Sequence, residues 1–158
     1  MLTNKGQTLI EVIVVAMVGI LVVTALTFAV IFSLRNASFA KNQSQATKLA
    51  QEGIERVRGL RDRNGAVDYI RADGSHTGNF NDLWVISFSC PANCHFYFNG
   101  TTLTGGTSSN SEPITLNFQR QILIEDQAAD QKKVTALVRW SDFAGSHESR
   151  LTTILRKL

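Results

Sequence analysis

Proline, cysteine and clustered charge are scarce in this chain of 158 residues, which has two prolines and two cysteines. No proline falls between Thr8 and Asp62, so nothing in that stretch forbids one continuous helix. The net charge is only +3, and no basic run is longer than two residues. Because proteins that bind nucleic acid concentrate Lys and Arg on one face, this spread of charge argues against nucleic acid as a partner.

Recognisable catalytic motifs are also missing. The sequence has no Gly-x-Ser-x-Gly elbow, no phosphate-binding glycine loop and no His-Glu-x-x-His pair. His76, His95 and His147 fall in predicted loops or at a strand start, without a pattern that ties them to a nucleophile. We therefore expect no catalytic residue, no cofactor and no bound metal, and a chain that is not an enzyme.

What the chain has instead is an uncharged apolar run from Val12 to Leu34, bounded by Glu11 and Arg35. At a helical rise of about 1.5 Å per residue the run covers roughly 35 Å, enough to span a bilayer. A secretory signal peptide has a shorter apolar core, of about 7 to 15 residues, and a small-residue cleavage site after it. A carboxylate at the edge of the run costs about 2 to 3 kcal/mol or more in lipid, so we expect Glu11 to have a specific role.

The residues before the run resemble a known family. Residues 5–11, Lys-Gly-Gln-Thr-Leu-Ile-Glu, lead into an apolar helix and are similar to the class III leader of type IV pilins and pseudopilins. The resemblance implies that a prepilin peptidase cuts between Gly6 and Gln7 and that the new amino group of Gln7 is methylated. Glu11 would then pair with the freed amine of Gln7 in a neighbouring subunit, because each charge alone is costly in lipid. Such a pair would fix the register in which subunits dock.

Two positions depart from the family pattern. Gln7 stands where family members usually have Phe, and Phe28 stands where major subunits usually have Pro. Without that proline we expect a straighter helix. The same absence favours a minor subunit over the bulk filament protein.

The resemblance also implies partners and a location. The partners would be the prepilin peptidase, other pilin subunits, and the assembly ATPase and platform membrane protein of the filament machinery. The precursor would cross the inner (cytoplasmic) membrane once, with its head domain outside the cytoplasm, before joining a pilus at the cell surface. Lys5, before the apolar run, favours a cytoplasmic amino terminus.

Beyond Arg35 the apolar residues are confined to one side of the predicted helix. They recur at steps of three and four, which indicates an amphipathic helix with one buried stripe, made of Ala46, Leu49, Ala50, Gly53, Ile54, Val57 and Leu60. We expect one continuous helix that ends near Asn64-Gly65, with two helices hinged around Asn36–Asn42 as the alternative. On this helix Glu52 and Arg56 stand four apart and are expected to pair. Residues 49–62 also resemble the helix end of PilV-type minor pilins.

Strand patterns fill the rest of the chain. The predicted strands are Leu83–Ser89, His95–Asn99, Ile114–Glu125, Val134–Trp140 and Arg150–Leu155, and the predicted loops are Ala66–Asn81 and Gly100–Ser111. Short polar connections between the last three strands favour an antiparallel meander. The apolar side chains on one face of this meander would pack against the helix stripe, because a few strands alone would be marginally stable.

These patterns predict an α+β fold that resembles pilins. A long N-terminal α-helix, membrane-spanning in its first half and amphipathic in its second, would pack on a C-terminal antiparallel β-sheet. The predicted segments are a leader peptide over residues 1–6, a transmembrane or filament-core helix over 7–34, an amphipathic helix half over 35–64 and a β-sheet head domain over 65–158.

Cys90 and Cys94 are the two cysteines, and they enclose three residues. Beyond a membrane helix they would face an oxidising compartment, where a cysteine pair most often forms a disulfide. A metal site that also uses His95 and a pair of free thiols are the alternatives, although the chain has no second ligand pair at zinc-finger spacing. Trp84 and Trp140 are interpreted as core anchors or sheet-face residues.

The sequence thus favours a minor pilin or pseudopilin, a structural subunit of a type IV pilus-like filament. Within filaments, a type II secretion pseudopilin and a DNA-uptake minor pilin stay open. The alternative from another class is a single-pass membrane-anchored binding domain that does not polymerise. In that case Glu11 would be incidental.

Overall fold

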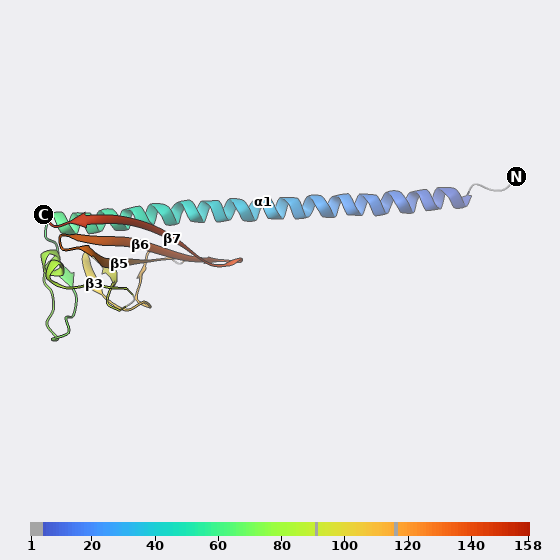
Figure 1. The fold of residues 1–158 in the computed structure, drawn as a ribbon. Coiled ribbons are helices and arrows are strands. Elements are labelled where there is room, and N and C mark those ends of the chain that lie inside the picture. The colour runs from blue at the N-terminus through green and yellow to red at the C-terminus, as the bar shows by residue number, and fades with distance from the viewer. Residues whose placement is uncertain (1–4, 91, 116) are drawn as a thin grey trace. The chain divides into compact units, whose positions relative to one another are not determined.

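The structure is a computed structural model of the chain that describes residues 5–90, 92–115 and 117–158. It divides into two compact units, residues 1–41 and residues 42–158, and each is described by itself. One helix, α1 (Lys5–Asp62), begins in the first unit and ends in the second (Figure 1). The second unit adds a seven-stranded sheet and a short 3-10 helix, η1 (Phe80–Val85).

Helix α1 is uninterrupted, as the absence of proline predicts. Residues 36–42 are helical, so the alternative of two helices joined by a non-helical hinge is not found. At its end Asn64 adopts a positive φ of 49°, and the amide of Gly65 donates to the carbonyl of Leu60 at 2.7 Å. With the Asn64 amide bonded to the Arg61 carbonyl at 3.2 Å, this is a Schellman motif. The predicted stop at Asn64-Gly65 is confirmed.

One sheet carries all seven strands of the described residues: β1 (Val67–Asp68), β2 (His95–Asn99), β3 (Thr102–Gly105), β4 (Glu112–Pro113), β5 (Phe118–Ala128), β6 (Gln131–Asp142) and β7 (Gly145–Arg156). The order is β1-β3-β2-β5-β6-β7, and β4 pairs with β5 off this path. Strands β5, β6 and β7 form the predicted antiparallel meander, in which Ile122 lies opposite Ala136 and Ala136 opposite Leu151.

The prediction of a wholly antiparallel sheet is wrong at one pair. Strand β1 pairs with β3 in parallel, with Val67 opposite Leu103. The chain between them, which includes η1 and β2, is a crossover long enough to bring the strand back in the same direction. The sheet is therefore mixed.

The predicted strand Leu83–Ser89 is wrong, because the run begins inside η1. Phe80 and Leu83 stand three apart, one 3-10 turn, and each is 1% exposed. The carboxylate of Asp82 accepts hydrogen bonds from the amides of Gly78 at 2.9 Å and Asn79 at 3.2 Å, which anchors the start of η1. That carboxylate was the sequence signal for a helical turn.

Three other boundaries need correction. The predicted loop Gly100–Ser111 contains β3, whose Leu103 is fully buried, and a single apolar residue among Thr and Gly was too short a pattern to reveal it. The predicted loop Ala66–Asn81 contains β1. The predicted strand Ile114–Glu125 begins only at Phe118, because β4 folds back on it with Glu112 opposite Arg120. The predicted strand at His95–Asn99 is confirmed, and β6 and β7 extend the strands predicted at Val134–Trp140 and Arg150–Leu155.

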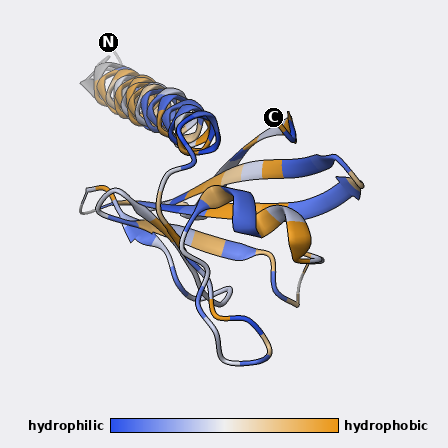
Figure 2. Cartoon of the chain, turned by 90° about the vertical axis from the view of Figure 1, so that its left-hand side faces the viewer, coloured by the Kyte–Doolittle hydropathy of each residue, from blue (hydrophilic) through white to orange (hydrophobic). Residues whose placement is uncertain are grey.

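The core of the second unit lies between α1 residues 46–60 and the meander, whose strands run beside that part of the helix (Figure 1). Hydrophobic and hydrophilic residues both occur along the strands (Figure 2). A Cβ at Gly53 would lie 2.9 Å from Cδ of Arg120, 3.3 Å from Cδ1 of Ile122 and 3.4 Å from Cβ of Ala136, so the helix crosses the sheet closely there. The predicted packing of the helix stripe on the meander is confirmed, and Trp140 is 2% exposed within this core.

Candidate functional site

The first unit presents an apolar surface that nothing within the unit covers. Every described side chain from Leu9 to Lys41 is exposed, with Leu21 at 71% and Phe28 at 69%. By length and composition, α1 can cross a membrane. An apolar surface of this extent is far larger than a soluble monomer normally exposes, so it requires lipid or other apolar chains around it. We call residues Leu9–Leu34 the apolar helix surface.

Two shallow hollows mark this surface. One is lined by Met17, Ile20, Leu21, Thr24, Ala25 and Phe28, and the other by Val23, Leu26, Thr27, Val30 and Ile31. The hydroxyl of Thr24 donates to the carbonyl of Ile20 at 2.8 Å, and that of Thr27 to Val23 at 2.9 Å. The threonine donors are therefore satisfied within the helix, and the hollows are suited to apolar side chains of another helix or to lipid.

The predicted cleavage and assembly residues lie at the start of α1. Gly6 and Gln7 are in its first turns, where only the backbone is described, and residues 1–4 of the predicted leader lie outside the described residues. The side chain of Glu11 is exposed. Glu11 is the one carboxylate on the apolar helix surface, and no basic residue follows it until Arg35.

In the second unit, Cys90 and Cys94 are joined by a disulfide, with their Cα atoms 5.1 Å apart. The enclosed turn is also held by Asn93, whose side-chain oxygen accepts from the Ser89 amide at 2.8 Å and whose amide nitrogen donates to the Ser87 carbonyl at 2.8 Å. Because their sulfurs are bonded to each other, neither cysteine supplies a thiolate for the alternative metal site with His95. Among the described residues, no group of three or more His, Cys, Asp or Glu side chains converges on a metal position.

Other polar residues weighed as candidates do not converge either. His76 contacts Asp68 at 2.6 Å, whereas His147 contacts Asp142 at 3.0 Å from the other end of the sheet. Each of these contacts joins two residues that are close together in the sequence.

Glu112 joins two arginines from different elements. One of its oxygens accepts from Arg56 of α1 at 2.8 Å, and the other accepts from Nε of Arg120 at 2.8 Å. The side chain of Arg120 is 1% exposed and also donates to the Leu49 carbonyl at 2.9 Å. The guanidinium of Arg56 lies 3.8 Å from the centre of the Phe98 ring. This network ties α1 to β4 and β5.

Sequence reasoning missed this network. The predicted Glu52–Arg56 pair is replaced, since Arg56 contacts Glu112 and Glu52 lies 3.4 Å from Arg120. A signal was present: Arg120 has the same strand parity as the buried Phe118 and Ile122, and a charge at such a position requires a partner.

A second buried basic residue, Lys132, is also paired with a carboxylate. Lys132 is 5% exposed; its Nζ donates to the Ile86 carbonyl at 2.7 Å and pairs with Asp126. The other Asp126 oxygen accepts from the Ser87 hydroxyl at 2.9 Å and from the Phe88 amide at 3.2 Å. Partial burial acts to raise the pKa of Asp126, but these hydrogen bonds and the Lys132 charge outweigh it and hold that pKa below its usual value. The pair fastens residues 86–88 to the β5–β6 hairpin.

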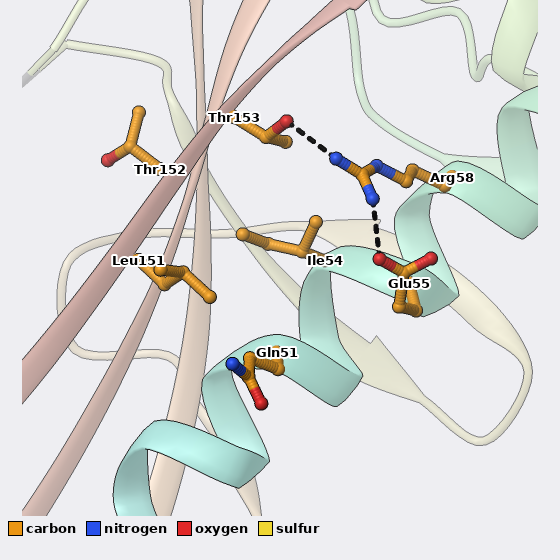
Figure 3. Close-up of a pocket in the computed structure, with 7 residues that line it drawn as sticks. All are labelled: Gln51, Ile54, Glu55, Arg58, Leu151, Thr152 and Thr153. Atoms are coloured by element: carbon orange, nitrogen blue, oxygen red, sulfur yellow. Dashed lines mark hydrogen bonds and ion pairs between the residues drawn. The ribbon is translucent and has the colours of Figure 1, made fainter.

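A groove of about 430 Å³ lies between α1 and the outermost strand, β7 (Figure 3). Ile54 and Leu151 form its apolar part, and Gln51, Glu55, Arg58, Thr152 and Thr153 complete the lining. Arg58 bridges the two elements, since it contacts Glu55 at 2.6 Å and the Thr153 hydroxyl at 2.9 Å. Glu55 and Arg58 are the charged residues of its lining.

Comparison of the chain with protein-family models, with curated proteins and with solved structures finds no match.

Proposed function

We propose that the chain is a minor pilin or pseudopilin, a structural subunit of a type IV pilus-like filament. The observation that carries the proposal is the apolar helix surface, which is exposed from Leu9 onward and bears one carboxylate, Glu11, the last of the leader-like residues 5–11. Such a surface requires an apolar environment. Lipid before assembly and the same segment of neighbouring subunits afterwards are similar environments, so transfer between them costs little.

In this proposal Gly6, Gln7 and Glu11 each take part in one step of processing or assembly. Prepilin peptidase cuts between Gly6 and Gln7, and the new amine of Gln7 is methylated. The carboxylate of Glu11 in one subunit then pairs with that amine in its neighbour and sets the docking register. The assembly ATPase and the platform protein move the subunit out of the inner membrane, and the head domain is displayed on the filament at the cell surface.

The fold supports this proposal in a general way. A helix that is apolar and exposed over its first part, then amphipathic and packed on an antiparallel meander, separates an assembly segment from a display domain. A single-pass anchored binding domain would use the same separation, and the groove beside β7 favours it as the second candidate. The two differ in whether the amino terminus is processed.

The intact mass of the protein from cells with a prepilin peptidase tests the proposal. We expect a chain that begins at Gln7, is heavier by one CH2 because a methyl group replaces a hydrogen of the new amine, and is lighter by the two hydrogens lost in the Cys90–Cys94 bond. The same chain from cells that lack the peptidase is the control and should keep Met1. A chain that retains Met1 in peptidase-competent cells would leave the anchored binding domain as the function.

A further inference from the structure

The two edges of the sheet differ in how they are protected. At one edge, β1 is two residues long, and short edge strands resist pairing with other chains. At the other edge, β7 is twelve residues long, contains no proline and pairs with β6 through twelve consecutive positions without a bulge. A long, regular edge strand of this kind offers a row of backbone groups to a further strand.

The contact between Arg61 and β7 tells which backbone groups face outward. The side chain of Arg61 donates to the carbonyl of Arg156 at 3.5 Å, so that carbonyl points away from β6. Backbone groups alternate in direction along a strand. The amides and carbonyls of Ile154, Thr152 and Arg150 therefore point outward as well, in the plane of the sheet.

The groove in Figure 3 lies beside this edge, on the face of the sheet that α1 covers. A strand added to β7 would place every second side chain on that face, next to Leu151 and the α1 residue Ile54. Its other side chains would lie on the opposite face, next to Thr152 and Ile154. The groove thus selects for small or apolar residues at alternate positions.

Charge on the opposite face gives a further requirement. Glu148 and Arg150 of β7 are already paired at 2.8 Å. On the groove side, Arg58 of α1 is paired with Glu55. Arg156, in contrast, forms no ion pair with any part of the chain that the structure describes. A carboxylate opposite Arg156 would complement it.

We propose that the outer edge of β7 binds an extended segment of another polypeptide as an added antiparallel strand, with apolar side chains over Ile54 and Leu151 and a carboxylate opposite Arg156. The site is a protein-docking surface and does not depend on whether the chain enters filaments. Its affinity comes from backbone hydrogen bonds and its selectivity from the alternate side chains.

A synthetic peptide with the sequence of Gly145–Arg156 is the probe, because it has the required pattern. When its Thr152 lies opposite Thr152 of the chain, its Glu148 lies opposite Arg156, and its Leu151 and Leu155 face the groove. Binding to the full chain in detergent micelles is measured by fluorescence anisotropy. We expect saturable binding that weakens severalfold when the peptide carries Glu148→Gln, with the difference falling at high salt.

A variant of the chain tests the edge itself. Ile154→Pro removes an outward amide and places a ring against the added strand, while the bonds of β7 to β6 stay intact. We expect about a tenfold or greater loss of affinity, and Ile154→Thr, which keeps the amide, should stay within about threefold of the wild type. Equal affinity of the Pro and Thr variants would overturn the proposal.

A modified peptide gives the same test without altering the chain. N-methyl groups on the peptide amides of Arg150, Thr152 and Ile154 should abolish binding, because those amides face β7, whereas N-methyl groups on Leu151 and Thr153 should not. Equal binding of the two methylated peptides, or no binding of the unmodified one, would refute added-strand binding. Dimers of the full chain that Ile154→Pro dissociates, seen by ultracentrifugation, would show that β7 of a second copy supplies the added strand.

Discussion

At the scale of single residues, the most informative feature is the burial of Arg120 and Lys132 on the core side of the sheet. Each is matched by a carboxylate, Glu112 or Asp126, that comes from a neighbouring element or strand. Breaking a buried ion pair by removing one partner leaves a charge without solvent or counterion, which costs much more than the loss of an exposed pair. Stability should therefore depend on these few carboxylates more than on the many charges at the surface.

Replacing Asp126 tests this at neutral and acid pH. Asp126→Asn should lower the free energy of unfolding by about 1 to 2 kcal/mol at neutral pH, because Lys132 loses its counterion. The pKa of Asp126 is lower in the folded than in the unfolded chain, so its contribution is complete above about pH 4 and is lost as the pH falls through the folded value. The difference between variant and wild type should close below about pH 4 in denaturant unfolding curves.

The matched control is the neighbouring pair, Glu125 and Lys133, which joins the same two strands but whose lysine side chain is 38% exposed, against 6% for Lys132. Glu125→Gln should change stability by less than about 0.5 kcal/mol at any pH. A loss as large as that of Asp126→Asn would mean that burial of Lys132 is not the cause.

At the scale of elements, the contact of α1 with the sheet depends on Gly53. Gly53→Ala should destabilise the chain by about 1 to 3 kcal/mol, because its Cβ would lie 2.9 Å from Cδ of Arg120, which is held in place by Glu112. Gly59→Ala on the same helix is the control. Its Cβ meets only the end of Arg63 at 3.5 Å, so the gain in helix propensity should raise stability by up to about 1 kcal/mol. Thermal unfolding of both variants measures the contrast, and a shift of the same sign in both would contradict the close crossing.

The helices and strands also show which elements sequence patterns can predict. Repeats at three and four residues correctly predicted the stripe from Ala46 to Leu60, and alternation predicted β5, β6 and β7, because long periodic segments carry a strong signal. Short elements escaped: β1 has two residues and β3 has one buried apolar side chain, too little for a pattern. The run after Leu83 has the composition of a strand, yet the local capping by Asp82 and the packing of Phe80 produce a 3-10 turn.

For the sites, sequence reasoning reached what is local along the chain. The adjacency of Cys90 and Cys94 and the position of Glu11 before an apolar run can be read directly. The network around Glu112 and the groove beside β7 join residues far apart in sequence, and their partners depend on strand register. The charged residues at buried strand positions, Arg120 and Lys132, were the signals that partners were needed.

At the scale of the whole molecule, Glu11 separates the two candidate functions. Under the filament proposal, Glu11→Ala should still be inserted and cleaved, because neither step needs the carboxylate, but it should be absent from filaments. Glu11→Asp keeps the charge and should retain part of the assembly. Immunoblots of membrane and sheared-filament fractions measure both variants. Normal entry of Glu11→Ala into filaments would remove the assigned role of the carboxylate.

The hydroxyls of Thr24 and Thr27 have a consequence for how the first unit selects its neighbours. Each hydroxyl donates to a carbonyl of its own helix. Transfer of the helix from one apolar environment to another therefore breaks no hydrogen bond at these positions. Selection between correct and incorrect neighbouring helices along that stretch must then come from shape complementarity, that is, from which side chains fill the two hollows. A bulky replacement at Ala25 would alter that choice without altering how well the helix dissolves in a bilayer.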